Sequence, residues 1–301
     1  MRGMGIAVAF LATLAAGAGC RDLQRDNGQM DAGVLAERES HLAQALAQPA
    51  ESAAGAKPVA RWILPESLAE VSGLALTPDG RLFAHGDEVG QVSELDYRRG
   101  VLVKQFTLGR NPVLEDFEGI TIAGERMFLL ASNGKIYEFR EGANDARVDY
   151  VVHDTRLGRE CEFEGITFDP DINALLLACK RVGTKHLHGD LVIYAWKLPD
   201  GGGSNSPVIV VPLREVIGSN KWQSLHPSDI TRDPANGNYV LVAAQEKALV
   251  TITSGGTVVS ARPLPSSLQH TEGVALTTDS LLILSDEAGK RPAVIVVYRW
   301  R

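Results

Sequence analysis

A six-residue segment that recurs along the chain constrains the fold more than any other sequence feature. Asp116–Thr121 reads Asp-Phe-Glu-Gly-Ile-Thr, and Glu162–Thr167 repeats it almost unchanged 46 residues later (165 − 119, from glycine to glycine). Looser copies lie at Glu70–Ala75, His226–Thr231 and His270–Ala275. A unit of this length that recurs together with several short strands is typical of a β-propeller, in which each unit forms one blade. The five copies therefore predict five blades.

Short β runs separated by turn residues follow each of the first four copies, and they predict blades of four strands. The expected strands lie at 72–76, 82–85, 91–96 and 101–107 in the first blade; at 119–122, 127–131, 135–139 and 148–153 in the second; at 165–168, 174–179, 191–196 and 208–212 in the third; and at 230–232, 239–243, 249–253 and 258–262 in the fourth. Two turn-rich insertions, 181–189 and 199–206, lengthen the third blade.

The last copy of the segment is followed by one strand too few, and this indicates how the ring closes. Only three strands are expected after it, at 273–276, 281–284 and 293–299. An unassigned strand, 59–64, stands at the start of the same domain. If this strand joins the last blade as its outer strand, every blade has four strands and the open sheet edge disappears. We therefore predict an all-β protein, a closed five-bladed propeller over residues 58–301.

The first 20 residues have the pattern of an export signal. Arg2 gives a positive start, the run 6–18 is apolar and built mostly from small residues, and the segment ends at Cys20. Gly17-Ala18-Gly19-Cys20 resembles a bacterial lipobox, although Gly17 stands where leucine is usual; ordinary cleavage after Ala18 is the alternative. We expect an exported protein with a lipid on Cys20, at the periplasmic face of the envelope and at the outer rather than the inner membrane.

Residues 21–57 are expected to link this signal to the propeller. The stretch is rich in Ala, Gln and Glu, and 32–47 has weak helical periodicity. The segment 51–56 consists of small residues and reads as a flexible link. The prediction is a flexible or partly helical tether, and a helix docked on the propeller is the less favoured alternative.

Net charge bears on the partners of the protein, and cysteine content bears on its cross-links. The formal net charge is −7 and the pI is about 5.6, so no basic surface for nucleic acid is expected. Cys161 and Cys179 lie on neighbouring predicted strands, and in an exported protein such a pair favours a disulfide; two buried free thiols are the alternative. We expect a monomer that contacts the membrane only through its N-terminal lipid.

The repeated segments predict an acidic site at one mouth of the propeller. In this fold the first strand of each blade lines the central channel, so residues that precede these strands gather at one end. Oxygen ligands without cysteine suit Ca²⁺, which binds six to eight oxygens. The predicted calcium ligands are Glu118, Glu164, Asp229 and Glu272. The alternative is that each acid caps a turn by accepting backbone N–H bonds.

Loops between the second and third strands should add further side chains to the same mouth. The predicted ligand-binding residues are Glu70, Asp87, Asn133, Lys180, Arg181, Glu246 and Asp286. Lys180 and Arg181 either hold an anionic ligand group or pair with Glu162 and Glu164, and pairing is favoured. His226 and His270 occupy matching repeat positions, where a hydrogen-bonded structural role is favoured over a catalytic one.

The quoted residues also carry a resemblance to a known family. Leu68–Gly73, Asp79–Ala84, Asp87-Glu88, Glu94–Asp96 and Asp116–Ile120 together resemble the SdiA-regulated family of bacterial exported proteins, over residues 59–301. The resemblance implies a five-bladed propeller, distantly related to NHL-repeat propellers, with a calcium site. Ser228-Asp229 departs from the Glu-Gly form of the other segments, which makes Asp229 a less secure ligand than Glu118 or Glu164.

Three functions compete on this reading. The favoured one is a calcium-binding module that recognises a small ligand or an envelope protein at the acidic mouth. The second is a calcium-dependent hydrolase of lactones, esters or phosphoesters, with Glu272 or His270 as base. The third is an envelope assembly scaffold. The chain lacks Gly-x-Ser-x-Gly, His-Glu-x-x-His and Gly-x-x-x-x-Gly-Lys, so no nucleophile motif decides whether it is an enzyme.

Overall fold

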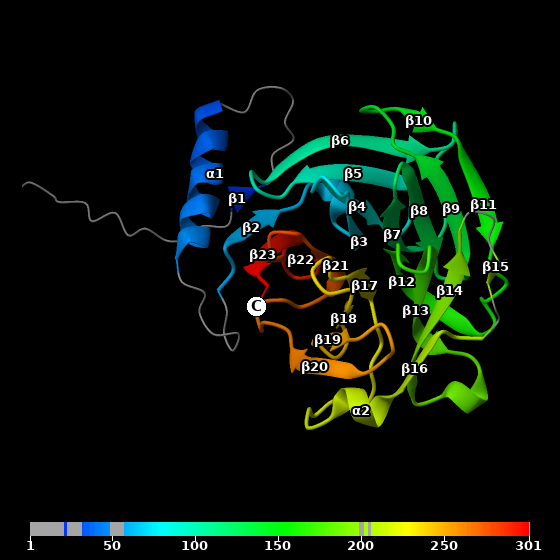
Figure 1. The fold of residues 1–301 in the computed structure, drawn as a ribbon. Helices are drawn as coiled ribbons and strands as arrows, with labels where there is room; N and C mark the ends of the chain where they lie inside the picture. Colours follow the sequence, from blue (N-terminus) through cyan, green and yellow to red (C-terminus); the bar gives the residue numbers. More distant parts are fainter. Residues whose placement is uncertain (1–20, 23–31, 49–56, 199–201, 204–205, 301) are drawn as a thin grey trace, which may run out of the picture.

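The protein is a five-bladed β-propeller, as the repeats predict. The computed structural model describes residues 21–22, 32–48, 57–198, 202–203 and 206–300. Five antiparallel sheets are arranged around one axis, and Figure 1 shows their innermost strands β3, β7, β12, β17 and β21 grouped at the centre. Each of these strands contacts the innermost strand of the next blade, and β21 contacts β3, so the ring is closed.

Four strands run from the axis to the rim of each blade. Blade 1 holds β3 (Val71–Leu76), β4 (Leu82–Gly86), β5 (Gln91–Asp96) and β6 (Val101–Leu108); blade 2 holds β7 (Phe117–Ala123), β8 (Arg126–Ala131), β9 (Lys135–Arg140) and β11 (Tyr150–Asp154). Blade 3 holds β12 (Cys161–Asp169), β13 (Ala174–Val182), β14 (Asp190–Lys197) and β16 (Ile209–Pro212); blade 4 holds β17 (Asp229–Arg232), β18 (Tyr239–Ala243), β19 (Ala248–Ile252) and β20 (Val258–Pro263).

Blade 5 joins the two ends of the propeller. It holds β21 (Thr271–Leu276), β22 (Leu281–Asp286), β23 (Val294–Arg299) and, as the outer strand, β2 (Ala60–Ile63). β2 pairs antiparallel with β23, so the predicted closure is confirmed. The indole Nε1 of the buried Trp62 on β2 donates to the carbonyl of Tyr97 in blade 1, at 2.8 Å. The closing strand is therefore held by its own blade and by blade 1.

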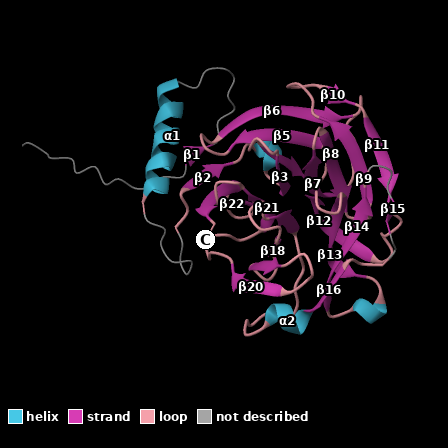
Figure 2. Cartoon of the chain, viewed as in Figure 1, coloured by secondary structure: helices cyan, strands magenta, loops and turns pink. Residues whose placement is uncertain are grey.

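Smaller elements decorate this ring (Figure 2). β1 (Arg21–Asp22) extends β2, β10 (Arg147–Val148) extends β6, and β15 (Gly202–Gly203) pairs with β14. The helices are α1 (Ala32–Ala47) and α2 (Leu213–Ile217), with short 3-10 turns at Glu66–Leu68 and Lys185–Leu187.

The core lies between the faces of adjacent blades. Alternating apolar side chains of each blade pack against the next, and Phe83, Phe117, Phe128, Phe163 and Tyr194 are among the largest that are fully buried. Complete burial of one such side chain stabilises a fold by roughly 1.5–3 kcal/mol. Contacts of this size between every pair of neighbours make the ring a rigid platform for whatever its mouth carries.

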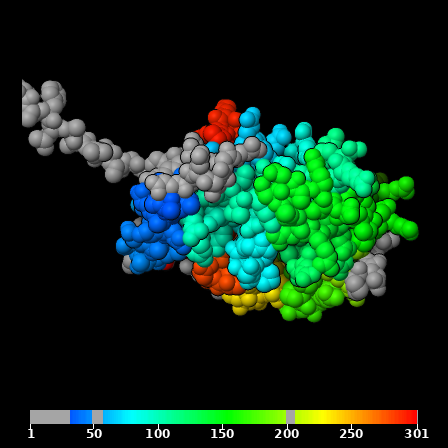
Figure 3. Space-filling view, turned by 90° about the horizontal axis from the view of Figure 1, so that it is seen from above, coloured from blue at the N-terminus to red at the C-terminus, as the bar shows by residue number. Residues whose placement is uncertain are grey.

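Helix α1 is docked on the propeller rather than held away as a tether. Arg38 donates to the carbonyls of Arg99 and Gly100 at 3.1 and 3.2 Å, and its guanidinium lies 5.3 Å from the Trp62 ring. Leu42 is buried, and in Figure 3 the helix, in blue, lies against the propeller. The docked alternative therefore describes 32–47 better than the favoured tether.

The remaining N-terminal predictions lie outside the described residues. These are the signal segment 1–20 with Cys20, and the parts of the tether at 23–31 and 49–56. Within the described ranges, no helix has the length and apolar character that a membrane crossing requires.

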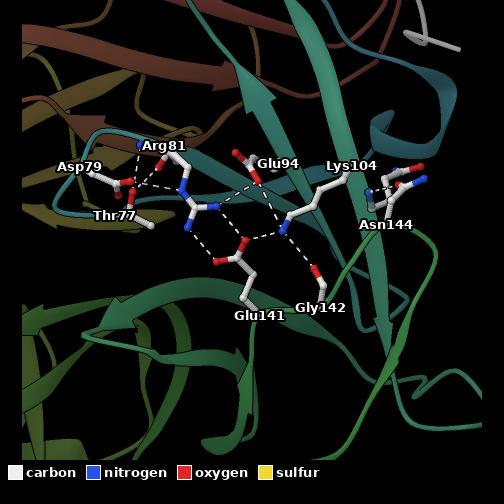
Figure 4. A network of polar contacts seen from close by, with 9 residues as sticks. Thr77, Asp79, Arg81, Glu94, Lys104, Glu141, Gly142 and Asn144 are labelled. Atoms are coloured by element: carbon white, nitrogen blue, oxygen red, sulfur yellow. Dashed lines mark hydrogen bonds and ion pairs between the residues drawn. The ribbon is translucent and has the colours of Figure 1, made fainter. Parts of the chain in front are cut away.

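A polar network joins blades 1 and 2 (Figure 4). Arg81, in the turn between β3 and β4, makes a bidentate ion pair with Glu141 after β9, with both N···O distances 2.7 Å. Lys104 contacts the same carboxylate and donates to the carbonyl of Gly142 at 3.0 Å. Hydrogen bonding from Arg81 lowers the pKa of Glu141 to about 2. This network is an inter-blade clamp.

Candidate functional site

Five equivalent positions lie near the starts of the five inner strands, at the end of the propeller that we call the mouth. Each immediately precedes a residue that packs at the axis, and the ring residues are Ser72, Glu118, Glu164, Ser228 and Glu272. The axial residue is glycine in four blades, because the backbones approach too closely for a side chain. A Cβ placed on Gly119 would lie 3.2 Å from the Cα of Gly165, and one on Gly165 would lie 2.9 Å from the Cα of Asp229.

Asp229 takes the glycine position of blade 4, and its role is structural. Its Oδ1 accepts from the N–H of Ile230 and its Oδ2 from the N–H of Val274 in blade 5, both at 2.8 Å. The side chain is completely buried and lines neither hollow of the mouth; its burial raises the pKa, and the N–H bonds oppose this. The capping alternative therefore describes Asp229, because both of its oxygens accept hydrogen bonds from backbone N–H groups.

The other three predicted calcium ligands meet at the mouth. Glu118, Glu164 and Glu272, from blades 2, 3 and 5, line a hollow of about 170 Å³. Its remaining lining residues are Glu70, Val71, Ser72, Asp87, Lys180 and Glu287. Ser72 donates to Glu118 Oε2 at 3.3 Å. Carboxylates this close repel one another and favour a proton or a cation between them.

Burial raises the pKa of four of the acids that line this hollow. Burial raises the pKa of Glu118 to about 8, and the charges of Asp116 and Glu272 add to this effect. Burial likewise raises the pKa of Glu272, Asp87 and Glu287. These four acids therefore retain a proton to higher pH than solvated carboxyl groups do.

Lys180 is the cation at the centre of this acid cluster. Its Nζ forms an ion pair with Oε1 of Glu164, whose side chain is 3% exposed. Lys180 also lowers the pKa of Glu118 and of Glu272, where burial is the larger and opposing influence. The predicted pairing with Glu164 is present, and so is the pairing of Arg181 with Glu162.

A β-bulge presents Lys180 to the mouth. The register of β12 and β13 pairs Glu162 with Arg181 and Phe163 with Cys179, so Lys180 has no partner across the strand pair. Bulges re-aim a side chain, and they are common beside functional sites. A disulfide joins Cys161 to Cys179 next to this bulge, with Cα atoms 5.6 Å apart.

A wider hollow of about 850 Å³ opens beside the acid cluster, over blades 3, 4 and 5. Besides Glu164, Lys180 and Glu272, its lining includes Arg181, His226, His270, Lys247 and Lys290. Lys247 and Lys290 are exposed, and within the described ranges neither forms an ion pair. Sequence reasoning missed both lysines, although each is in the loop after the second strand of its blade, next to residues that it had placed at the mouth.

Two predicted ligand-binding acids support loops instead. Glu246 accepts from the His226 backbone N–H at 3.0 Å and lies 2.7 Å from its Nδ1, and Ser224 also donates to it. Asp286 accepts from the backbone N–H groups of Gln269 and His270. Neither acid lines a hollow, and neither does the exposed Asn133, which caps its own turn through Lys135 N–H.

The predicted calcium ligands have suitable donor atoms, but their arrangement does not fit a metal ion. Carboxylate and hydroxyl oxygens are suitable calcium ligands. However, no set of three or more His, Cys, Asp or Glu side chains among the described residues is arranged to hold a metal ion. Glu164 is engaged by Lys180, and both oxygens of Asp229 are engaged by backbone N–H groups. The calcium site therefore stays a prediction, and these residues as arranged do not fit it.

The fold and these residues define a β-propeller module with two neighbouring hollows lined by charged side chains. No protein-family model and no curated protein sequence matches the chain, so the resemblance to the SdiA-regulated family stays a prediction.

Solved structures are similar in fold. A glutaminyl cyclase of Myxococcus xanthus superposes with a TM-score of 0.56 at 14% identity, covering 80% of this chain and 95% of that one. A luciferin-regenerating enzyme gives a TM-score of 0.49 at 10% identity, covering 77% and 94%. A PQQ-bound aldose sugar dehydrogenase of Streptomyces coelicolor gives 0.46 at 13%, covering 81% and 98%. At these identities the likeness shows the propeller fold alone.

Proposed function

We propose that this protein is a ligand-binding propeller module whose mouth takes a small polar molecule with an anionic group. The observation that carries the proposal is the hollow of about 850 Å³, whose lining includes Lys247 and Lys290 as well as the carboxylates of Glu164 and Glu272. Ligand pockets of proteins usually measure roughly 300–1,000 Å³.

The charge distribution fits a ligand that is anionic at one end and donates hydrogen bonds at the other. Lys247 and Lys290 are free to pair with a carboxylate or phosphate, because no carboxylate in the described residues pairs with them. Glu272, on the axial side, accepts hydrogen bonds from hydroxyl or amino groups. Hydrogen bonds in which one partner is charged are about twice as strong as neutral ones. The ligand would therefore bind in one orientation.

Calorimetric titration with phosphate, succinate and citrate tests the proposal. We expect at least one of the three to bind the wild type, and we expect Lys247→Gln with Lys290→Gln to weaken it about tenfold or more. Lys197→Gln is the matched control, because Lys197 ends β14 and lines neither hollow. Binding that is absent for all three anions, or equal in the double variant and the wild type, would refute an anion site here.

A second candidate, hydrolysis at the same hollow, is favoured by the His226–Glu246 pair. Glu246 holds the Nδ1 side of the imidazole, and its pKa is lowered because hydrogen bonds from His226 and Ser224 outweigh the effect of burial. This arrangement leaves Nε2 as the basic nitrogen. Nε2 would take a proton from water while the water oxygen attacks an ester carbonyl or phosphorus, and would return it to the leaving oxygen.

Colorimetric turnover of p-nitrophenyl acetate, p-nitrophenyl phosphate and a simple lactone tests this second candidate. We expect wild-type hydrolysis of one substrate that falls about 100-fold in His226→Gln. His186→Gln, which alters a histidine outside both hollows, is the control. If the wild type turns over none of the three, or if His226→Gln is as active as the wild type, the binding function stands alone.

The cellular setting in the proposal comes from the N-terminal sequence. The apolar run and Cys20 support export and a lipid anchor at the periplasmic face of the envelope. Mass spectrometry of the mature N-terminus is expected to find a diacylglyceryl group on Cys20, whereas an unmodified N-terminus downstream would contradict the anchor.

A further inference from the structure

The acid cluster at the mouth contains a cation of its own. Glu118, Glu164 and Glu272 come from three blades, and Lys180 lines the same hollow of about 170 Å³. Its Nζ is in direct contact with Glu164. Both hollows of the mouth include Lys180, so its ammonium lies where the acidic and the basic sides meet.

The structure assigns to Lys180 the role of a built-in counter-cation that stands in place of a divalent metal ion at this propeller mouth. The inference concerns the same mouth as the proposed function but does not depend on ligand binding. It also explains why the sequence predicts calcium there while the arranged residues do not fit it.

The local fold is built to hold this ammonium in position. Lys180 has no register partner between the pairs Glu162–Arg181 and Phe163–Cys179, and at this bulge it lines the small hollow. Cys179, directly before it, is tied by its disulfide to Cys161 on β12. Glu164 lies on the same strand, β12, and the residue as a whole is 2% exposed. A buried carboxylate is stable when a cation or hydrogen-bond donors contact it, and for Glu164 Lys180 makes this contact.

Charge and space oppose a metal ion at the same point. A calcium ion needs six to eight oxygens, including both charged and neutral ones. To recruit Glu164 it would have to displace the ammonium and leave that positive charge beside a doubly charged ion. Ser72 and Ser228 hold the ring positions in which other blades have Glu, so only three ring carboxylates remain available.

Calcium titration of chelator-treated protein, read by calorimetry and thermal unfolding, tests the role of Lys180. We expect the wild type to show no saturable binding at about 1 mM calcium, in the range of weak extracellular sites. We expect Lys180→Gln to bind calcium about tenfold or more tightly than the wild type and to gain melting temperature with it. Lys180→Arg, which keeps the charge, should behave as the wild type.

Arg181→Gln is the matched control, because it removes a neighbouring cation whose partner Glu162 is largely solvated, with a 39% exposed side chain. It should leave calcium binding unchanged. If Lys180→Gln fails to fold, Lys180→Gln with Glu164→Gln removes both charges of the pair and should restore folding without a calcium site. Tight calcium binding by the wild type, or an equal calcium response in wild type and folded Lys180→Gln, would overturn the inference.

Discussion

At the scale of single residues, the mouth of this propeller is governed by how its carboxylates are neutralised. The carboxylate of Asp229 accepts hydrogen bonds from backbone N–H groups, and that of Glu164 pairs with the ammonium of Lys180. Glu118 has no such partner at close range among the described residues, and its pKa is raised. Three residues of one chemical type thus have three roles, which depend on whether the nearest donor is backbone, side chain or solvent.

The raised pKa of Glu118 predicts a pH-dependent stability. Its folded pKa is about 8 against an ordinary 4.5, so the folded state holds the proton more tightly than the unfolded chain. The resulting stabilisation is present below about pH 4.5 and is lost as the pH rises to about 8. We expect the melting temperature of Glu118→Gln to fall less than that of the wild type as the pH rises. At pH 8 the variant should melt about 2–4 °C higher than the wild type.

Thermal unfolding between pH 5 and pH 8 provides the measurement, with Glu88→Gln, an exposed acid, as the control. A wild-type melting temperature that rises over this pH window, or parallel curves for Glu118→Gln and wild type, would contradict the assignment.

Residue roles were the part of the site that sequence reasoning reached least well. The repeat places Glu118, Glu164 and Glu272 correctly at the mouth. The repeat also places Asp229 at the glycine position, but it does not show that backbone N–H groups of Ile230 and Val274 occupy the Asp229 carboxylate, because Val274 belongs to another blade. Nor does it show that Glu246 accepts bonds from its neighbours His226 and Ser224, since those bonds depend on a loop conformation.

At the scale of elements, the disulfide and the bulge act together on the β12–β13 pair. Cys161 and Cys179 are separated by 18 residues in the chain, and a cross-link over a loop of this length stabilises by about 3 kcal/mol in the chain-entropy model. We therefore expect a reducing agent to lower the melting temperature of the wild type. A variant with Cys161→Ser and Cys179→Ser should melt at the lower value with or without the reductant.

The same variant should also affect the acid cluster at the mouth. Because Lys180 follows Cys179, loosening the bulge should also weaken the pairing of Lys180 with Glu164. An unchanged melting temperature on reduction, or a double variant that still responds to reductant, would show that this bond does not support the fold.

The elements themselves followed closely from the sequence. Strands expected at 82–85 and 239–243 are observed at 82–86 and 239–243, because turn residues bound the apolar runs on both sides. The docking of α1 on the propeller could not be predicted from local sequence patterns. It depends on Arg38 reaching carbonyls of blade 1 and on Arg299 donating to the carbonyl of Ala45, and these contacts join distant parts of the chain.

At the scale of the whole molecule, closure of the ring by β2 is the feature on which the fold depends. Truncation tests this directly. A chain beginning at residue 57 keeps β2 and should unfold cooperatively, at a somewhat lower temperature because the contacts of α1 are lost. A chain beginning at residue 65 exposes the edge of β23 and should aggregate or fail to fold.

Trp62→Ala is the matching point substitution, because it removes the buried indole without exposing the strand edge. The expected loss is about 3–5 kcal/mol of unfolding free energy, measured by urea denaturation. A chain from residue 65 that unfolds like the chain from residue 57 would mean that β2 is dispensable.

The closed ring also explains why the mouth can hold so much like charge. Its inner strands are fixed by packing between blades, so the three ring glutamates cannot move apart, and a proton or a cation between them relieves their repulsion. In this chain that cation is Lys180, and the neighbouring lysines extend the positive charge into the larger hollow.

Crystals soaked in manganese, a divalent ion with anomalous scattering that accepts oxygen ligands as calcium does, test this account most directly. In the wild type the account predicts Lys180 Nζ among Glu118, Glu164 and Glu272, with no anomalous peak at the mouth. In Lys180→Gln it predicts a peak among the same three carboxylates. An anomalous peak at that point in the wild type, with Lys180 turned away, would contradict it.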